Sequence, residues 1–178
     1  MVASIILLLL GLCSYSDGRM MFDFQGEYLE CGNGLPMLGG DMSKMYVFTD
    51  ENNTLLLDGV FLYTKDYYSP IKWSVTSEHL ERGSWRPGII SKVVPDMCAV
   101  ILNPLEPWYV VTRTMQQTKC PYLTGHEESF HMLELGNLGI NFPHAFAGDW
   151  RFYLNVTVTR NGRKVMECLF VEVSVIEE

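Results

Sequence analysis

Two runs of strand-forming residues flank Asn161 and Gly162 near the end of the sequence, and this residue pair is typical of a two-residue β-hairpin turn. Both central residues of such a turn need a positive φ, which asparagine and glycine tolerate best. Because strand pairs are counted outward from the turn, Arg160 is expected opposite Arg163. The sequence therefore predicts a hairpin over residues 150–175 with a defined register, and we expect this hairpin to be the scaffold of the fold.

The alternation of side chains along each strand separates an apolar face of this hairpin from a mixed face. The apolar face is predicted to contain four cross-strand pairs: Phe152–Val171, Leu154–Leu169, Val156–Glu167 and Val158–Val165. Glu167 is the charged exception on that face. The mixed face places Arg151 opposite Glu172, which carries the opposite charge. A slip of one residue would move Leu154 and Val156 among polar groups, so the hydrophobic pattern supports the counted register.

Length and composition point to a single globular domain. The chain has 178 residues, of which 48% are hydrophobic, and this is enough for a substantial core. The same hydrophobic content excludes intrinsic disorder. The formal net charge is −8, and lysine and arginine form no cluster in the sequence. Nucleic acids and anionic membrane surfaces both attract basic patches, so we expect neither as a partner.

Residues 1–16 are predicted to be a secretory signal peptide. An apolar run over residues 5–10 is followed by small residues at Ser14 and Ser16, although no positive charge precedes the run. The run is shorter than the roughly 20 residues that a membrane span requires. An uncleaved anchor or an interfacial helix is the alternative. No later stretch is long and apolar enough to cross a bilayer, so we expect residues 17–178 to form one secreted, extracellular domain.

Cysteine usage agrees with that compartment. Removal of the signal peptide removes Cys13 and leaves Cys31, Cys98, Cys120 and Cys168, an even number that is compatible with two disulfides. Three connectivities are possible, and the residues alone do not choose among them. A metal site is the competing interpretation. The cysteines contain no close pair and no histidine lies at ligand spacing, so we expect neither a metal nor another cofactor.

Two glycosylation sequons, Asn52-Asn53-Thr54 and Asn155-Val156-Thr157, also fit a secreted protein. Asn52 lies in a polar stretch that is typical of a turn. Asn155 lies on the mixed face of the hairpin, which would have to be accessible to carry a glycan. We therefore predict N-glycosylation at Asn52 and Asn155, with unused sequons as the alternative.

Strand-forming segments separated by turn residues continue through the rest of the chain. Besides the two arms of the hairpin, strands are expected at residues 44–49, 54–64, 71–76, 89–94 and 130–135. Asp96 is a suitable N-cap for a short helix at residues 97–102, and Pro107 allows a second helix at residues 108–116. Residues 82–88 contain two glycines and a proline and are predicted to form a loop. This pattern predicts a mostly β protein, an antiparallel, immunoglobulin-like β-sandwich or β-cup with a short helical insert.

Known catalytic motifs are absent from the sequence. It lacks a Gly-x-Ser-x-Gly elbow, a phosphate-binding loop and a dinucleotide fingerprint. Glu127 and Glu128 would point to opposite faces of a strand, so they are interpreted as solvated charges rather than as a catalytic pair. The four histidines are interpreted as surface or loop residues: His79, His126, His131 and His144. We therefore expect that the protein is not an enzyme.

The order of several short motifs resembles a known family. The motifs occur as in insect secreted proteins related to the ganglioside activator protein: Asp96-Met97-Cys98, the helical insert, Lys119-Cys120-Pro121-Tyr122 with Gly125, and Gly148-Asp149-Trp150-Arg151 before the hairpin. Asn52-Asn53-Thr54 followed by Asp58-Gly59 also resembles an early strand of that group. The group includes the chemosensory-protein-A family and belongs with the ML lipid-recognition proteins. The resemblance spans residues 50–175 and rests on order and spacing, because each motif is short.

This resemblance implies a β-cup whose two layers do not close tightly and leave a cavity for lipid tails or other apolar molecules. It also implies a disulfide between Cys98 and Cys120, which leaves Cys31 to pair with Cys168. The group carries no catalytic machinery, and many of its insect members are associated with chemosensory or reproductive tissue. We therefore expect a secreted, non-enzymatic binding protein for a lipid or other small hydrophobic ligand, with a cell-surface receptor as a further candidate partner.

Apolar pockets bind ligands chiefly by removing apolar surface from water, so such a cup needs wide apolar walls. Trp108 lies beside a loop and is a candidate for the mouth of the cavity, and the other candidate residues lie on the predicted inward faces. The full set of candidate cavity residues is Phe61, Tyr63, Trp73, Val75, Trp108, Phe152, Leu154, Val156, Leu169 and Val171. Trp85 also lies beside a loop and is a second candidate for the mouth. The alternative is an extracellular adhesion or receptor-accessory module, in which these side chains fill the core and the surface carries the function.

Overall fold

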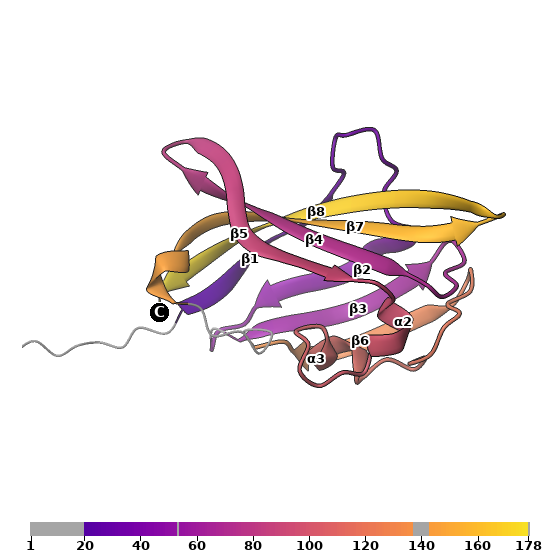
Figure 1. The fold of residues 1–178 in the computed structure, drawn as a ribbon. Coiled ribbons are helices and arrows are strands. Elements are labelled where there is room, and N and C mark those ends of the chain that lie inside the picture. Colours follow the sequence, from indigo (N-terminus) through magenta and orange to yellow (C-terminus); the bar gives the residue numbers. More distant parts are fainter. Residues whose placement is uncertain (1–19, 53, 137–142, 178) are drawn as a thin grey trace, which may run out of the picture.

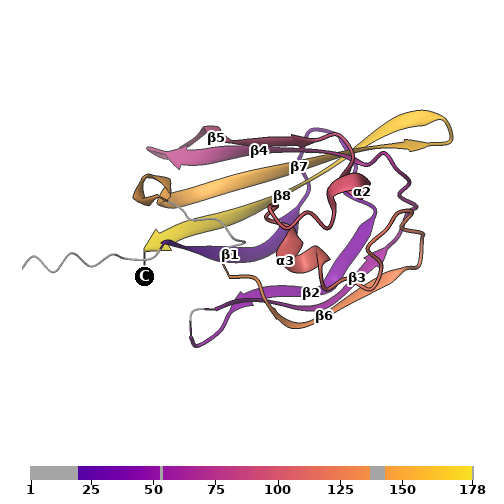
Figure 2. The same ribbon diagram turned by 60° about the horizontal axis from the view of Figure 1, so that its bottom comes forward.

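The computed structural model describes residues 20–52, 54–136 and 143–177. Its strands form two antiparallel sheets that pack face to face (Figures 1 and 2). The larger sheet has the spatial order β1 (Met20–Leu29), β8 (Arg163–Glu177), β7 (Gly148–Arg160), β4 (Lys72–Glu81) and β5 (Ser84–Val94). The smaller sheet has the order β2 (Gly40–Thr49), β3 (Leu55–Tyr63) and β6 (Glu127–Glu134). The predicted mostly β, antiparallel sandwich is therefore confirmed.

Three short helical elements interrupt the strands: α2 (Met97–Val100), α3 (Tyr109–Thr112) and the 3₁₀ helix η1 (His144–Phe146). Asp96 caps α2 as predicted, since its carboxylate accepts a hydrogen bond of 3.0 Å from the backbone N–H of Cys98. Both α-helices end earlier than predicted. The β-branched residues Val110 and Val111 in α3 disfavour a longer helix. No helix in the described part of the chain is long and apolar enough to cross a membrane.

The β7–β8 hairpin has the register that the Asn161-Gly162 turn predicts. Arg160 lies opposite Arg163, and the pairing continues without a break to Gly148 opposite Val175. Asn161 and Gly162 have φ values of 50° and 72°, as this turn requires. Because β7 and β8 both lie inside the larger sheet, the correct register of this hairpin positions the neighbouring strands on each side.

The apolar interior is divided into two cores. The first core joins the two sheets and contains Met20, Leu55, Leu57, Phe130, Leu135, Trp150, Val173 and Val175. The second core joins the larger sheet to the helical insert and contains Tyr67, Ile71, Val94, Met97, Ile101, Tyr122, Val156 and Val158. The larger sheet is therefore covered by two different structures, the smaller sheet in one region and the insert in the other.

The ends of β2, β4 and β6 lie up to five residues from their predicted positions, and two other strands differ more strongly from the sequence-based expectation. β1 was not predicted, and it pairs with β8 as the outermost strand of the larger sheet. The predicted loop at residues 82–88 is wrong, because the chain turns at Arg82 and Gly83 and then continues as β5 from Ser84. Pro87 is tolerated in this strand because β5 is an edge strand and the register shifts between Thr76 and Glu78 on its partner.

The structure contains disulfides between Cys31 and Cys168 and between Cys98 and Cys120, which are the pairs that the family resemblance implied. The Cys98–Cys120 bond closes the helical insert upon itself. The Cys31–Cys168 bond joins the connection between β1 and β2 to β8, where the backbone N–H of Cys168 also donates to the carbonyl of Pro36 at 2.9 Å. One disulfide therefore cross-links the insert internally, and the other holds the connection between β1 and β2 against the larger sheet.

Gly59 on β3 is expected to tolerate no side chain, because its φ is +107° and a Cβ atom there would lie 1.9 Å from the carbonyl oxygen of Lys44 on β2. Gly59→Ala should therefore lower the free energy of unfolding by about 3 kcal/mol or more, since β2 and β3 must separate locally. Gly162→Ala is the matched control. Gly162 has a φ of +72°, and no atom lies within 4 Å of a Cβ built there. Gly162→Ala should therefore lower the free energy of unfolding by only about 1 kcal/mol. Urea unfolding measures both losses, and equal values would contradict the argument.

Candidate ligand-binding region

The structure brings the candidate cavity residues together on the inward faces of the sheets and on the insert. Eight of them belong to or contact a core: Phe61, Phe152 and Val171 at the first, and Tyr63, Trp73, Trp108, Leu154 and Val156 at the second. The other two are Val75 and Leu169, which lie opposite Leu154 on the neighbouring strands β4 and β8. Seven of the ten residues therefore lie on the inner face of the larger sheet, Phe61 and Tyr63 face them from the smaller sheet, and Trp108 belongs to the insert.

Six apolar side chains that are partly buried form a group that we call the central band: Phe61, Val75, Met115, Phe152, Leu154 and Val171. Five of them pack against a core, and Val75 is paired with Leu154 on the neighbouring strand. All six are half-buried, whereas the members of the two cores are at most 9% exposed. Val75 lies beside Leu154, and Phe152 lies beside Val171, on the larger sheet. Met115 of the insert contacts both cores. The central band is therefore a group of apolar side chains that keep part of their solvent-accessible surface.

Trp108 holds the insert against the larger sheet at the β5 edge. Its ring meets Trp73 edge-to-face at 6.0 Å between centroids, and its Nε1–H donates to the carbonyl of Val100 at 3.3 Å. The ammonium of Lys92 on β5 lies 5.2 Å from the Trp108 ring centroid and forms an ion pair with Glu106. A cation–π contact and an ion pair at such a partly exposed site are each weak. This edge is therefore held by several modest contacts rather than by one strong one.

Glu128 holds the end of the insert onto β6. Its carboxylate is 1% exposed and accepts hydrogen bonds from the backbone N–H groups of Gln116, at 2.6 Å, and Gln117, at 3.0 Å. Nε2 of His126 lies 2.7 Å from the same carboxylate. The interpretation of Glu127 and Glu128 as two solvated charges is therefore wrong for Glu128. The strand alternation that exposes Glu127 turns Glu128 into the interior.

Two tyrosines stack beside this carboxylate. The rings of Tyr63 and Tyr122 are nearly parallel, with an interplanar angle of 6° and 4.9 Å between centroids. The His126 ring lies 5.7 Å from that of Tyr63 on the same side of the molecule as Glu128. The backbone of Tyr122 is fixed by reciprocal hydrogen bonds with Tyr67, at 2.8 and 3.0 Å. The stack is therefore a rigid aromatic surface at one end of the candidate region.

Glu167 is the second fully buried carboxylate and lies where the chain crosses between the sheets. Its Oε1 accepts from Nη1 of Arg160 at 2.5 Å and from Nζ of Lys65 at 3.0 Å. Its Oε2 accepts from the hydroxyl of Tyr67 at 2.5 Å and from the backbone N–H of Gly39 at 3.3 Å. One side chain on β8 therefore binds the segment before β2 and the segment after β3.

The protonation states of this cluster follow from its contacts. Burial would raise the pKa of Glu167, but the hydrogen bonds and charges of Arg160, Tyr67 and Lys65 outweigh burial and hold the pKa below its ordinary value. Burial raises the pKa of the Tyr67 hydroxyl, and the neighbouring Glu167 carboxylate raises it further. At neutral pH Glu167 is therefore ionised and Tyr67 is a neutral hydrogen-bond donor.

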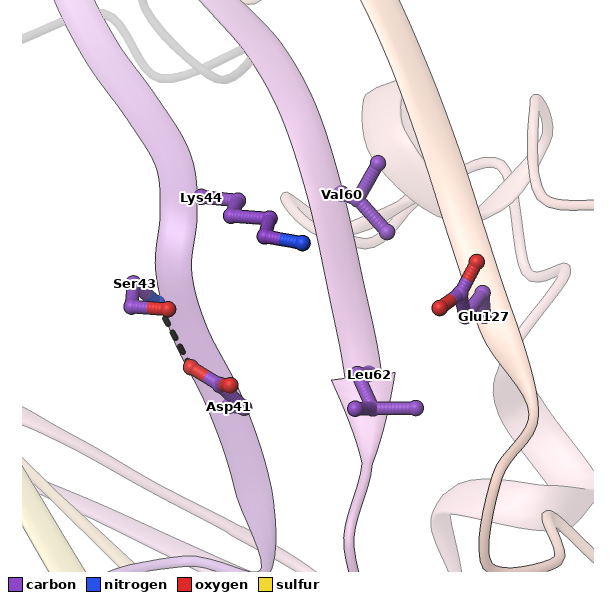
Figure 3. A pocket seen from close by; sticks show the side chains of 6 residues that line it. All are labelled: Asp41, Ser43, Lys44, Val60, Leu62 and Glu127. Atoms are coloured by element: carbon purple, nitrogen blue, oxygen red, sulfur yellow. Dashed lines mark hydrogen bonds between the residues drawn. The ribbon is translucent and has the colours of Figure 1, made fainter.

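Two surface depressions lie outside the central band. The larger has a volume of about 360 Å³ and a polar lining beside the Glu167 cluster: Thr64, Lys65, Asp66, Tyr68, Thr124, Thr159, Arg160 and Asn161. Figure 3 shows the smaller one, of about 90 Å³, between side chains of β2, β3 and β6: Asp41, Ser43, Lys44, Val60, Leu62 and Glu127. None of the ten candidate cavity residues lines either depression.

Trp85 lies on the outer face of the larger sheet instead of at the predicted mouth, because the segment around it is part of β5. The guanidinium of Arg151 lies 4.0 Å from the Trp85 ring centroid and 5.5 Å from that of Phe170. Tyr153 stacks on Phe170 with 5.2 Å between centroids. We call these four residues the outer aromatic cluster.

Sequence reasoning missed the buried roles of Glu128 and Tyr122 and the partners of Glu167. A signal existed for Glu167, since a lone carboxylate opposite Val156 on an apolar face requires buried partners. No local pattern identifies Lys65 as such a partner, because 102 positions separate the two residues. Within the described residues, no three His, Cys, Asp or Glu side chains are grouped so that they could hold a metal ion.

Glu167→Gln should lower the free energy of unfolding by about 3 kcal/mol at pH 7, because it leaves Lys65 and Arg160 without their shared carboxylate. The pKa of Glu167 is below its ordinary value of 4.5 in the folded protein. Its contribution is therefore complete above that value and is lost as the pH falls through the lower, folded pKa. Urea unfolding from pH 7 to pH 3 should show the difference between wild type and variant shrinking at the acidic end.

Glu172→Gln is the matched control for this experiment. Glu172 also pairs with an arginine, Arg151, at 2.6 Å, but both side chains remain partly exposed. Its replacement should therefore cost about 0.5 kcal/mol. Losses of equal size in the Glu167 and Glu172 variants, or a Glu167 loss that does not change with pH, would contradict the assignment.

No model of a protein family matches the chain, and no curated protein matches it significantly in sequence. The resemblance to the ML lipid-recognition group therefore stays a prediction from the order of short motifs.

Proposed function

We propose that the protein is a secreted, non-enzymatic carrier that holds a lipid or another small hydrophobic ligand between its two sheets. The observation that supports this proposal is the central band. Its six apolar side chains face the interior and yet remain only half-buried, between cores whose members are nearly sealed from solvent. Side chains in a filled sandwich lose almost all of their accessible surface, so the accessible band favours space for a guest.

The band offers a driving force of useful size. Removing apolar surface from water contributes about 25 cal/mol per Å². A ligand that covers on the order of 300 Å² of this wall would gain roughly 7 kcal/mol before the entropy cost of association. Because association costs about 4 kcal/mol or more, this wall area alone supports only weak binding. Micromolar affinity, about 8 kcal/mol net, requires the ligand's own buried apolar surface to contribute as well.

The same proposal includes export from the cell. Cys31–Cys168 and Cys98–Cys120 are disulfides, which persist in oxidising compartments. Extracellular fluid is also where a carrier for a poorly soluble molecule is needed, and chemosensory or reproductive fluid is the setting that the family resemblance suggests. A cell-surface receptor that collects the ligand is the corresponding protein partner.

Filling the central band should remove ligand binding. Val75→Trp places a large ring among the inward-facing side chains of the band, and it should weaken displaceable binding of the apolar fluorescent probe 1-NPN about tenfold or more. Thr76→Trp is the matched control, since Thr76 is the next residue on β4, points to the opposite face and is exposed. It should leave the probe affinity unchanged. Fluorescence titration of the folded, disulfide-bonded protein measures both.

A wild-type protein that binds no apolar probe, together with organic extracts of secreted protein that contain no lipid, would contradict the carrier proposal. Equal probe affinity in the two tryptophan variants would also contradict it, because binding would then lie elsewhere on the surface. Circular dichroism confirms that each variant is folded, and Val75→Phe is the smaller replacement if the tryptophan variant is not.

The glycan on the secreted protein is expected at Asn52. Its side chain is exposed in the turn between β2 and β3, whereas Asn155 is half-buried in β7 between Ser74 and Cys168. Asn52→Gln should therefore remove the mass of a glycan from protein secreted by eukaryotic cells, and Asn155→Gln should leave it. Mass spectrometry before and after glycosidase treatment measures the mass of the glycan. Loss of the glycan only in the Asn155 variant would contradict the prediction that Asn52 is the glycosylated residue.

A surface-acting adhesion or receptor-accessory module is the second candidate function, and the outer aromatic cluster favours it. Tryptophan, tyrosine and arginine are enriched among the residues that dominate binding energy at protein interfaces. Trp85, Arg151 and Tyr153 meet on one face of the larger sheet and remain half-buried rather than sealed. Trp85→Ala would weaken partner binding under this alternative and leave probe binding unchanged.

A further inference from the structure

The hydroxyl of Tyr122 is buried and lacks a hydrogen-bond partner within the described residues. The side chain belongs to the second core and is only 4% exposed. A buried polar group without a partner costs about 1–3 kcal/mol, and nearly all such groups in folded proteins are satisfied. An orphaned hydroxyl at this position therefore needs an explanation beyond packing.

Neighbouring polar groups differ in this respect. The hydroxyl of Tyr67 donates to Glu167, and the imidazole of His126 is bonded to Glu128. The backbone of Tyr122 is also satisfied through its bridge with Tyr67. The unpaired oxygen is therefore a specific feature of the Tyr122 side chain rather than a sign of loose structure in this region.

The Tyr63–Tyr122 stack connects this hydroxyl to the central band. Tyr63 is half-buried on the inward face of β3, and its ring meets that of Phe61 edge-to-face at 4.8 Å. Phe61 is a member of the central band. The aromatic stack that carries the unsatisfied hydroxyl therefore adjoins the central band through Phe61.

The negative charge of Glu128 near the Tyr122 hydroxyl determines which ligand groups this hydroxyl can bind. Burial raises the pKa of Tyr122 to about 12, and the negative charge of Glu128 is the second cause. Burial, followed by Tyr122 and Glu128, likewise raises the pKa of Tyr63. Both hydroxyls are therefore neutral donors, and the nearby Glu128 carboxylate repels an anionic ligand group.

We propose that Tyr63 and Tyr122 form a polar anchor at one end of the central band, which selects ligands with an uncharged hydrogen-bond acceptor on an apolar body. Esters, ketones, ethers and alcohols of long-chain hydrocarbons fit this description, whereas carboxylates and phosphates do not. The inference rests on the proposed carrier function and specifies its ligand class. Tyr122 supplies the donor that the ligand acceptor satisfies, and Tyr63 supports its ring.

Competition against 1-NPN with three ligands of similar length tests the anchor: dodecyl acetate, which has a neutral acceptor, pentadecane, which has none, and dodecanoate, which is an anion at pH 8. The full-length, disulfide-bonded protein should bind dodecyl acetate about three- to tenfold more tightly than pentadecane, as expected for one net hydrogen bond. Dodecanoate should bind more weakly than the acetate. Tyr122→Phe should abolish the preference for the acetate and leave pentadecane binding unchanged.

Controls separate this inference from the carrier proposal. Tyr46→Phe alters an exposed tyrosine on β2 and should retain the full preference. Tyr122→Phe should also raise the melting temperature of the ligand-free protein, because it removes the unsatisfied hydroxyl. Tight pentadecane binding without a preference for the acetate, or a preference that survives in Tyr122→Phe, would overturn the anchor and leave the carrier standing. Failure of all three ligands and of 1-NPN to bind would overturn both.

Discussion

The buried carboxylate of Glu167 is the contact on which the relative position of the two sheets depends. It projects from β8 into an otherwise apolar face and is stable there only because Lys65, Arg160, Tyr67 and Gly39 all supply hydrogen bonds. Gly39, Lys65 and Tyr67 belong to the segments that enter and leave the smaller sheet, whereas Arg160 ends β7 of the larger sheet. Coulombic attraction and hydrogen-bond geometry thus fix the crossing more narrowly than apolar contact would, since apolar contact has no preferred direction.

Glu128 plays the equivalent part for the insert, by binding the backbone of Gln116 and Gln117 to β6. With polar contacts holding the sheets and the insert at their margins, dense packing is not required everywhere between them. The two cores supply the apolar stabilisation, and the central band lies between them. A guest that fills the band would add apolar burial that the protein alone leaves unused, so stability and ligand binding are expected to be coupled.

Local sequence patterns were sufficient to predict the mostly β fold class, the β7–β8 hairpin and the start of α2. The Asn161-Gly162 turn fixes a register that the structure reproduces, and Asp96 caps α2 as its position indicates. Features that depend on distant partners were not predictable in this way. Pro87 and Gly88 are typical of a loop, but an edge strand with a register shift accommodates them. The burial of Glu128 depends on the insert folding back over β6, which no short stretch of sequence encodes.

The spacing of the two disulfides has a consequence for biosynthesis. Cys98 and Cys120 are separated by 22 positions and can meet soon after the insert leaves the ribosome, whereas Cys31 must wait 137 positions for Cys168. That late cysteine lies on β8, the strand that also brings Glu167 and fits between β1 and β7. The nascent chain consequently exposes the apolar inner face of the larger sheet until β8 has been synthesised. Under the proposed carrier function, loading with a hydrophobic molecule can therefore precede closure of the sandwich.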